Sequence, residues 1–210
     1  MSNLTTFDFS ARAENTQGAT RRETPLHHII HPNAEMAKVA FNEVAFCAQL
    51  TLRGNPDNAD FLAGVEKALG VALPLTPLTS HASDSYYVFW IGPNEWLILA
   101  PNLAPAAVEA SLRAELTGHF AVVDVSGGQT LMTLSGEAVR EVLQKSCGYD
   151  VEACFPVGKV VTTHFGKATV VLHHQIEGTY LMVVRRSFAD YVWRWLEDAS
   201  AEFGLMVKGA

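Results

Sequence analysis

Cysteine is scarce in this chain of 210 residues. Only Cys47, Cys147 and Cys154 are present, and no two of them form a Cys-x-x-Cys pair. An odd count without such a pair argues against a disulfide scaffold and against a zinc knuckle, and it fits a reducing compartment. We therefore expect three buried, unreactive thiols in a protein of the cytoplasm.

Positive charge is also in short supply, with 15 Lys and Arg residues against 22 Asp and Glu and a formal net charge of −7. An acidic chain repels phosphates and lacks the basic surface of a nucleic-acid binder. No run of Lys and Arg suggests an anionic membrane surface as partner. No stretch reaches the roughly 20 apolar residues of a membrane-spanning helix, and residues 1–20 contain no apolar run for a signal peptide. We therefore expect neither a nucleic-acid partner nor a membrane partner.

Phosphate-binding loops and metal motifs are missing as well. The chain contains neither the P-loop pattern nor Gly-x-Gly-x-x-Gly. Gly127 and Gly128 stand between two expected strands, whereas a dinucleotide needs a helix N-terminus for its pyrophosphate. The adjacent His173 and His174 point to opposite faces of a strand, and no grouping of His or Cys has zinc spacing. The sequence therefore predicts no cofactor, no metal and no catalytic residue in this chain.

Apolar residues, in contrast, are plentiful: 49% of the chain is hydrophobic and 18% is charged, which is enough for a sizeable core. Residues 1–24 differ, because they are polar and carry Arg21 and Arg22. Such arms are usually disordered alone, and some become ordered against a partner. We expect residues 1–24 to form a flexible arm that packs on a neighbouring protein, and residues 25–210 to form a single domain.

Hydrophobic periodicity and turn residues predict the elements of this domain. The expected strands cover residues 41–52, 85–91, 95–100, 120–125, 129–134, 159–165, 169–174 and 180–185. The expected helices cover residues 58–69, 105–116, 136–146 and 187–203, with Ser187 as the cap of the last. The order β-α-β-β-α-β and then β-α-β-β-β-α predicts two repeats, at about 41–126 and 127–207. The predicted fold is α+β, with two ferredoxin-like split βαβ units that share a mainly antiparallel sheet.

Asp124 and Ser126 are the candidate acid–base residues of the chain. Asp124 ends an apolar strand, where a carboxylate can serve as a general base, although Asp at such a place more often turns or caps the chain. Ser126 does not stand in Gly-x-Ser-x-Gly, and no histidine and acid flank it in a recognisable pattern. We expect a structural role, in which Asp124 accepts backbone hydrogen bonds at the strand junction.

The last helix offers a candidate interface. At 100° per residue, one stripe is expected to face the core; it consists of Phe188, Tyr191, Val192, Trp195, Ala199 and Phe203. Trp193 points away from that stripe, with Arg194 beside it. Because Trp and Arg are enriched at interface hot spots, we expect Trp193 and Arg194, together with Arg21 and Arg22, to contact a partner.

Several segments resemble the sarcosine oxidase gamma subunit family, with matching order and spacing from about Pro25 to Phe203. They are residues 90–97 (WIGPNEWL), 123–126 (VDVS) with Thr130, 134–136 (LSG), 185–189 (RRSFA) and 193–196 (WRWL). More distantly, Asp124, Ser126, Gly136 and Ala138 are similar to a motif of the folate-binding domain of aminomethyltransferases. The histidine of that motif is Gly127 here, which argues against a stand-alone folate-binding protein or folate-dependent one-carbon transferase, the main alternative. A generic ferredoxin-like interaction domain is a further alternative.

The resemblance implies a heterotetrameric enzyme that oxidises sarcosine to glycine and forms hydrogen peroxide and, with tetrahydrofolate, 5,10-methylenetetrahydrofolate. It implies FAD, FMN, NAD, zinc and tetrahydrofolate in the alpha, beta and delta subunits, and none of them in the gamma subunit. The expected role of this chain is to support assembly of that complex without an active site of its own.

Overall fold

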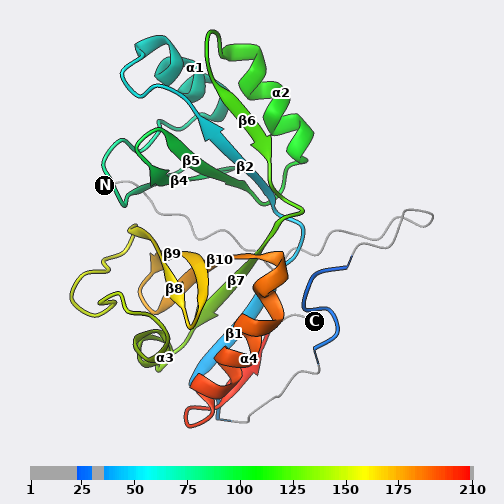
Figure 1. Ribbon diagram of the computed structural model, residues 1–210, viewed down its shortest axis with the longest axis vertical. Helices are drawn as coiled ribbons and strands as arrows, with labels where there is room; N and C mark the ends of the chain where they lie inside the picture. The colour runs from blue at the N-terminus through cyan, green and yellow to red at the C-terminus, as the bar shows by residue number, and fades with distance from the viewer. Residues whose placement is uncertain (1–22, 30–35, 209–210) are drawn as a thin grey trace. The chain divides into compact units, whose positions relative to one another are not determined.

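A computed structural model of the protein describes residues 23–29 and 36–208. The elements follow in the order β1 (Val39–Val44), β2 (Ala48–Arg53), α1 (Ala59–Leu69), β3 (Ser80–Ala82), β4 (Tyr87–Gly92), β5 (Glu95–Ala100), α2 (Pro105–Glu115), β6 (Ala121–Asp124), β7 (Gln129–Ser135), α3 (Val139–Ser146), β8 (Val160–Phe165), β9 (Ala168–Ile176), β10 (Thr179–Arg185), the 3-10 helix η1 (Arg186–Phe188), α4 (Ala189–Ser200) and β11 (Leu205–Val207) (Figure 1). They form two compact units. The first comprises Cys47–Gly127 and Gly158–Val161, and the second comprises the other described residues.

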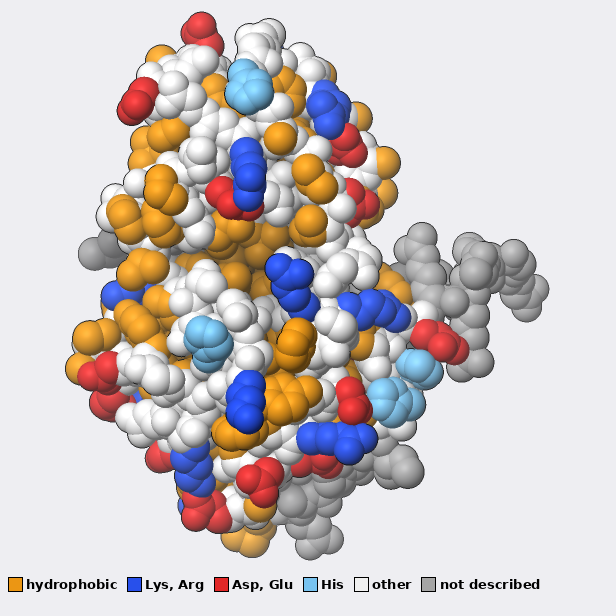
Figure 2. All heavy atoms as spheres, in the orientation of Figure 1, with side chains coloured by type: hydrophobic (Ala, Val, Ile, Leu, Met, Phe, Trp, Pro, Cys, Tyr) orange, Lys and Arg blue, Asp and Glu red, His pale blue; other side chains and the backbone are white. Residues whose placement is uncertain are grey.

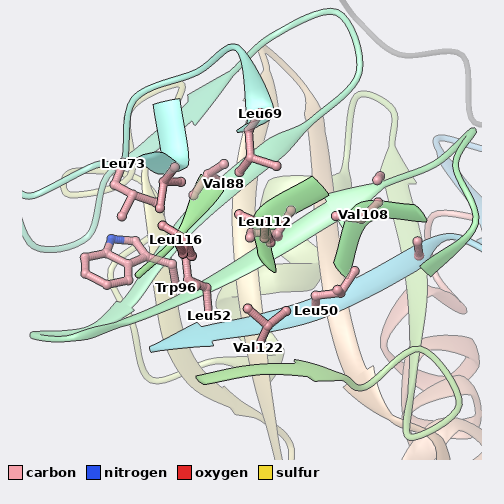
Figure 3. Packing of buried hydrophobic residues seen from close by; sticks show 14 of the residues in the cluster. Leu50, Leu52, Leu69, Leu73, Val88, Trp96, Val108, Leu112, Leu116 and Val122 are labelled. Carbon is pink, nitrogen blue, oxygen red and sulfur yellow. The ribbon is translucent and has the colours of Figure 1, made fainter. Parts of the chain in front are cut away.

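The first unit contains a five-stranded sheet in the order β3-β4-β5-β2-β6, in which all neighbours are antiparallel. Alternate residues such as Leu50 and Leu52 of β2 point to one face, where they meet Leu112 of α2 (Figure 3). Full burial of such a side chain contributes about 1.5–3 kcal/mol. The two helices and one face of this sheet therefore form a core of their own.

Helix α1 begins and ends where its sequence predicts. The Oδ1 atom of Asn58 accepts hydrogen bonds from the backbone N–H groups of Asp60 (3.0 Å) and Phe61 (3.3 Å). Gly70 ends the helix at φ 65°, a left-handed conformation that glycine adopts without a steric penalty. The expected helix at 58–69 is confirmed, as are the expected helix at 105–116 and the expected hairpin strands at 85–91 and 95–100.

The second unit contains a six-stranded sheet in the order β11-β1-β7-β10-β9-β8. Strand β1 pairs with β7 in antiparallel orientation and with β11 in parallel orientation, and β10 pairs antiparallel with both β7 and β9. Helix α4 packs against β1 through Trp193, whose ring centroid lies 4.9 Å from that of Phe41. Helix α3 contacts α4, so both helices belong to the body of this unit.

The α+β class and the antiparallel pairing are confirmed, but the expected single shared sheet is wrong. The strand expected over 41–52 is broken in two, because β1 ends at Val44 and β2 begins at Ala48. Between them Phe46 adopts a left-handed conformation with φ 58°. Strand β1 belongs to the six-stranded sheet and β2 to the five-stranded one. Apolar residues at this turn continue the alternation of the strands and hide the break.

Two strands and one helix boundary differ from the expectation. Strands β3 and β11 were not predicted, because three residues are too few to show alternation. Ser187 does not cap the last helix: η1 precedes α4, and the backbone N–H of Ala189 donates to the carbonyl oxygen of Arg186. A backbone N–H at the start of the helix, which was expected to donate to the serine hydroxyl, thus donates to a backbone carbonyl of the 3-10 turn instead.

The expected domain organisation stays a prediction. The first compact unit ends at Gly127, close to the predicted repeat boundary, yet β1 belongs to the second unit although the first repeat was expected to begin near residue 41. The arm expected at 1–24 lies outside the described residues except for Glu23 and Thr24.

Candidate functional site

The candidate acid–base residues lie where β6 ends. One carboxylate oxygen of Asp124, Oδ1, accepts hydrogen bonds from the Ser126 hydroxyl (2.6 Å) and from the Ser126 backbone N–H (2.9 Å). The Ser126 hydroxyl oxygen in turn accepts from the backbone N–H of Gln49 (2.9 Å). The backbone N–H of Val125 donates to the Gln49 carbonyl oxygen (2.8 Å). The last paired residues of β2 and β6 are Leu50 and Asp124. The hydrogen bonds of this junction therefore extend the contact between the two strands by one or two residues.

This arrangement suits a structural junction better than a catalytic one. A nucleophilic serine needs its hydroxyl proton to face a base that is itself oriented by a third group. The Ser126 hydroxyl donates instead to an exposed carboxylate on its own turn. Among the described residues, the hydrogen-bond partners of Ser126 are Asp124 and Gln49, and neither is a histidine. The prediction that Asp124 accepts a backbone hydrogen bond is confirmed.

Residues of the hairpin motif at 90–97 also make structural contacts. Trp96 of β5 is fully buried, and its Nε1 donates to the carbonyl oxygen of Pro74 over 2.8 Å. Glu95 forms an ion pair with Arg53 across the β2–β5 pair, at 2.9 Å. Trp96 therefore connects the five-stranded sheet to the loop that contains Pro74, and Glu95 connects β5 to β2 within this sheet.

The two adjacent histidines of β9, His173 and His174, are both buried. His174 Nδ1 lies 2.7 Å from the carbonyl oxygen of Phe155, and its ring stacks on that of Tyr180 with centroids 4.5 Å apart. Burial, and to a smaller extent the charge of the neighbouring His174, lower the pKa of His173 from 6.5 to about 3, so His173 is neutral at physiological pH. In the part of the chain that the structure describes, no three His, Cys, Asp or Glu side chains gather as metal ligands do.

The thiols were expected to be buried and unreactive, and two of them are buried. Burial raises the pKa of Cys47 to about 12 and that of Cys147 to about 11, so neither forms a thiolate near neutral pH. Cys154 is exposed, which contradicts the expectation for this residue. It lies in the loop between α3 and β8, where its carbonyl oxygen accepts a hydrogen bond from the Tyr149 hydroxyl (2.9 Å).

The expected interface residue Trp193 is buried, with 3% of its surface exposed, so the expectation that it points away from the core is wrong. The buried stripe of α4 is a different one and consists of Ala189, Val192, Trp193, Leu196 and Ser200. Phe188 and Trp195, which were expected in the core, are 42% and 37% exposed. Two apolar stripes of similar width compete on this helix, and contact with Phe41 selects the one that contains Trp193.

The other expected interface residues are arginines. Arg194 is exposed, and its Nε donates to Asp190 on the same helix over 3.0 Å. Arg21 and Arg22 lie outside the described residues. The interface role of Arg194, Arg21 and Arg22 therefore stays a prediction. As for a membrane, no helix within residues 23–29 and 36–208 has the length and apolar character needed to cross one.

Comparison with known proteins gives one consistent family. The sarcosine oxidase, gamma subunit family model matches residues 53–202. Sarcosine oxidase subunit gamma of Corynebacterium sp. (strain P-1) is 32% identical over 200 residues, or 91% of this chain and 97% of that protein. The subunit gamma of Arthrobacter sp is 32% identical over 199 residues, again 91% of this chain and 97% of that protein.

Solved structures agree with this assignment. A chain of the heterotetrameric sarcosine oxidase from Corynebacterium sp. U-96 superposes with a TM-score of 0.77 at 31% identity, covering 87% of this chain and 96% of that one. The glycine cleavage system aminomethyltransferase T from Bartonella henselae superposes with a TM-score of 0.62 at 13% identity, covering 81% of this chain and 48% of that one, which shows a shared fold. By its sequence over most of its length and by its fold, this chain belongs to the sarcosine oxidase gamma subunit family.

Proposed function

We propose that this chain is the gamma subunit of a heterotetrameric sarcosine oxidase and that it supports assembly without an active site of its own. The observation that carries the proposal is the similarity, at 31% identity and over 96% of that chain, to a chain of a heterotetrameric sarcosine oxidase. The similarity covers 87% of this chain and 96% of that one, so it extends well beyond a single shared module.

The reaction we assign to the complete complex is the oxidative demethylation of sarcosine to glycine, with formation of hydrogen peroxide and 5,10-methylenetetrahydrofolate. In this proposal the partners are alpha, beta and delta subunits, which hold FAD, FMN, NAD, zinc and tetrahydrofolate, and the complex works in the cytoplasm. Amine oxidation needs an electron acceptor that ordinary side chains do not supply, so the gamma subunit depends on these partners for chemistry.

The side chains of this chain support a non-catalytic role. Asp124 and Ser126 hydrogen-bond to each other and to the backbone at the end of β6. His173 is buried and neutral, and His174 is engaged with the Phe155 carbonyl. A general acid or base must reach a substrate proton, and none of these four groups is both accessible and free of a structural hydrogen bond.

Residues 1–24 are proposed to contribute to assembly. Their polar composition predicts that they pack on another subunit and not on the core of this chain. Removal of residues 1–22, which leaves Glu23 and its contact with Arg186 in place, should weaken assembly and leave the melting temperature of the free chain nearly unchanged. A large drop in that melting temperature would show that the arm serves the fold of this chain instead.

Co-expression with the three other subunits tests the main proposal. The affinity-tagged chain should retain them in a stable complex that contains flavin and forms peroxide from sarcosine, whereas the chain purified alone should be colourless and inactive. A complex of the other three subunits with the same stability and turnover would contradict an assembly role. Quenching of the tryptophan fluorescence of the free chain by tetrahydrofolate would instead favour the alternative, a folate-binding protein.

A further inference from the structure

Three aromatic side chains line the outer side of η1 and α4; we call Phe188, Tyr191 and Trp195 the aromatic strip. The ring centroids of Phe188 and Tyr191 lie 6.4 Å apart, and those of Tyr191 and Trp195 lie 6.2 Å apart. Phe188 is 42% exposed and Trp195 is 37% exposed. Figure 2 shows hydrophobic side chains gathered over α4, with Lys and Arg side chains beside them. A contiguous apolar strip with polar surroundings is typical of an interaction surface.

The aromatic strip is held in place before any partner binds. The hydroxyl of Tyr191 accepts a hydrogen bond from the backbone N–H of Lys167 (3.0 Å), and Nε1 of Trp195 donates to the Ser146 hydroxyl (3.1 Å). Gly166 lies directly beneath, where a Cβ atom would stand 2.6 Å from the Tyr191 hydroxyl and 2.9 Å from Trp195 Cδ2. Side chains that are already fixed lose little conformational entropy on association, so such a surface is preorganised for binding.

Three basic residues lie close to Phe188 and Tyr191, in the sequence or through a backbone contact. Arg185 and Arg186 precede Phe188 in the chain, and Lys167 contacts Tyr191 through its backbone. Among residues 23–29 and 36–208, none of these three cations has a carboxylate partner, although Arg186 donates to the carbonyl oxygen of Glu23. The chain as a whole carries a net charge of −7. A basic edge on an acidic protein favours an acidic partner surface.

We propose that the aromatic strip docks onto another subunit of the oxidase, on an apolar surface whose rim is acidic. The proposal rests on the proposed function, since it presupposes that the chain enters the complex. A second copy of this chain fits less well, because a two-fold contact through the strip would bring Lys167, Arg185 and Arg186 close to their own copies. Tyr, Trp and Arg, all three present here, are the residues most enriched among interface hot spots.

Variants of the strip test this proposal in the complete complex and in the free full-length chain. Phe188→Ala and Trp195→Ala should each weaken binding of this chain to the remaining subunits by about 30-fold, the effect typical of a hot spot. Lys167→Glu and Arg185→Glu should slow association by about tenfold at low salt, with a smaller effect at high salt. Leu75→Ala, at another exposed hydrophobic residue, and Lys208→Glu, at another exposed cation, are the matched controls and should change neither quantity.

The melting temperature of each free variant separates binding from folding. Phe188→Ala should leave it within a few degrees of the wild type, because the Phe188 side chain is 42% exposed. Equal binding by Phe188→Ala, Trp195→Ala and Leu75→Ala would overturn the strip proposal while the function stands. A wild-type chain that does not enter the complex would overturn the function itself. A strip variant that abolishes a dimer of the free chain, with unchanged subunit binding, would assign the strip to self-association and also overturn the proposal.

Discussion

The Ser126 hydroxyl donates to the Asp124 carboxylate over 2.6 Å and at the same time accepts from the backbone of Gln49 over 2.9 Å. A side-chain pair that resembles a substrate-binding motif in sequence thus bonds to the protein itself. The carboxylate completes the turn after β6, and the hydroxyl connects this turn to β2. Both residues satisfy backbone groups here, so their presence in the sequence does not by itself indicate a chemical role.

Substitution of Asp124 should affect stability and not turnover. Asp124→Ala removes the acceptor of two hydrogen bonds and should lower the free energy of unfolding by about 1–2 kcal/mol. Turnover of the assembled complex, corrected for the amount of complex, should stay within about twofold of the wild type, because no substrate-facing step depends on this carboxylate. Urea unfolding and a peroxide assay check the two parts, with Asp84→Ala as an exposed control. A hundredfold loss of turnover in an intact complex would show that this subunit takes part in catalysis.

Trp193 should contribute to the core of the second unit. Trp193→Ala removes a buried ring that packs on Phe41 and should destabilise the free chain by about 3–5 kcal/mol. Trp193→Phe keeps much of the contact and should cost less. Trp195→Ala, at a ring that is 37% exposed, should also cost less than Trp193→Ala. Urea unfolding of the free chain gives the comparison. Wild-type stability of Trp193→Ala together with weakened assembly would restore the role that the sequence alone suggested.

The stability of the protein should fall below about pH 6.5 because of His173. The unfolded chain binds a proton with the ordinary pKa of 6.5, and the folded chain only near pH 3. Between these values the unfolded state binds more protons, so each pH unit of acidification should cost about 1.4 kcal/mol until the folded pKa is reached. His173→Gln should remove this slope, and His119→Gln, at an exposed histidine, should keep it. Urea unfolding at pH 7.5, 6 and 5 measures the slope, and equal slopes for all three proteins would contradict the assignment.

The thiols should differ sharply in reactivity. Cys154 is exposed, whereas Cys47 and Cys147 are buried with pKa values raised to about 12 and about 11. At pH 8, a thiol reagent such as Ellman's reagent should modify one cysteine of the folded free chain rapidly and the other two only after denaturation. Cys154→Ser should abolish the rapid phase. A rapid phase that persists in Cys154→Ser would mean that one of the buried thiols becomes accessible in the folded chain.

The sequence predicts elements that local residues determine. Asn58 and Gly70 mark the ends of α1, and the turn between Gly92 and Glu95 marks a hairpin, so these bounds are readable without tertiary information. The break at Phe46 is not, because its left-handed conformation is uncommon for a phenylalanine and its neighbours continue the pattern of a strand. The chain passes from one sheet to the other at this turn and returns between β6 and β7. Because the first of these breaks is hidden in the sequence, the separation into two sheets is not predicted.

The candidate site was predictable to a similar degree. The turn role of Asp124 follows from its place after a short strand, and the structure confirms it. The orientation of α4 does not follow from its sequence, since both Trp193 and Trp195 stand on apolar stripes and only the contact with Phe41 decides between them. The aromatic strip was therefore assigned to the core, although the exposed fraction of Phe188 and Trp195 places both rings on the surface.

The arrangement of strands also sets the order in which the chain can fold as it is synthesised. The strands of the five-stranded sheet lie between Ala48 and Asp124, so this sheet can form early. The six-stranded sheet begins with β1 and is completed by β11, which pairs with β1 in parallel. Strand β1 is consequently unpaired on one edge until β7 has been synthesised. Its other edge is unpaired until β11, which ends at Val207, has left the ribosome. During that time its open edges are exposed to other chains, which gives a nascent gamma subunit a period of vulnerability that ends only with its last strand.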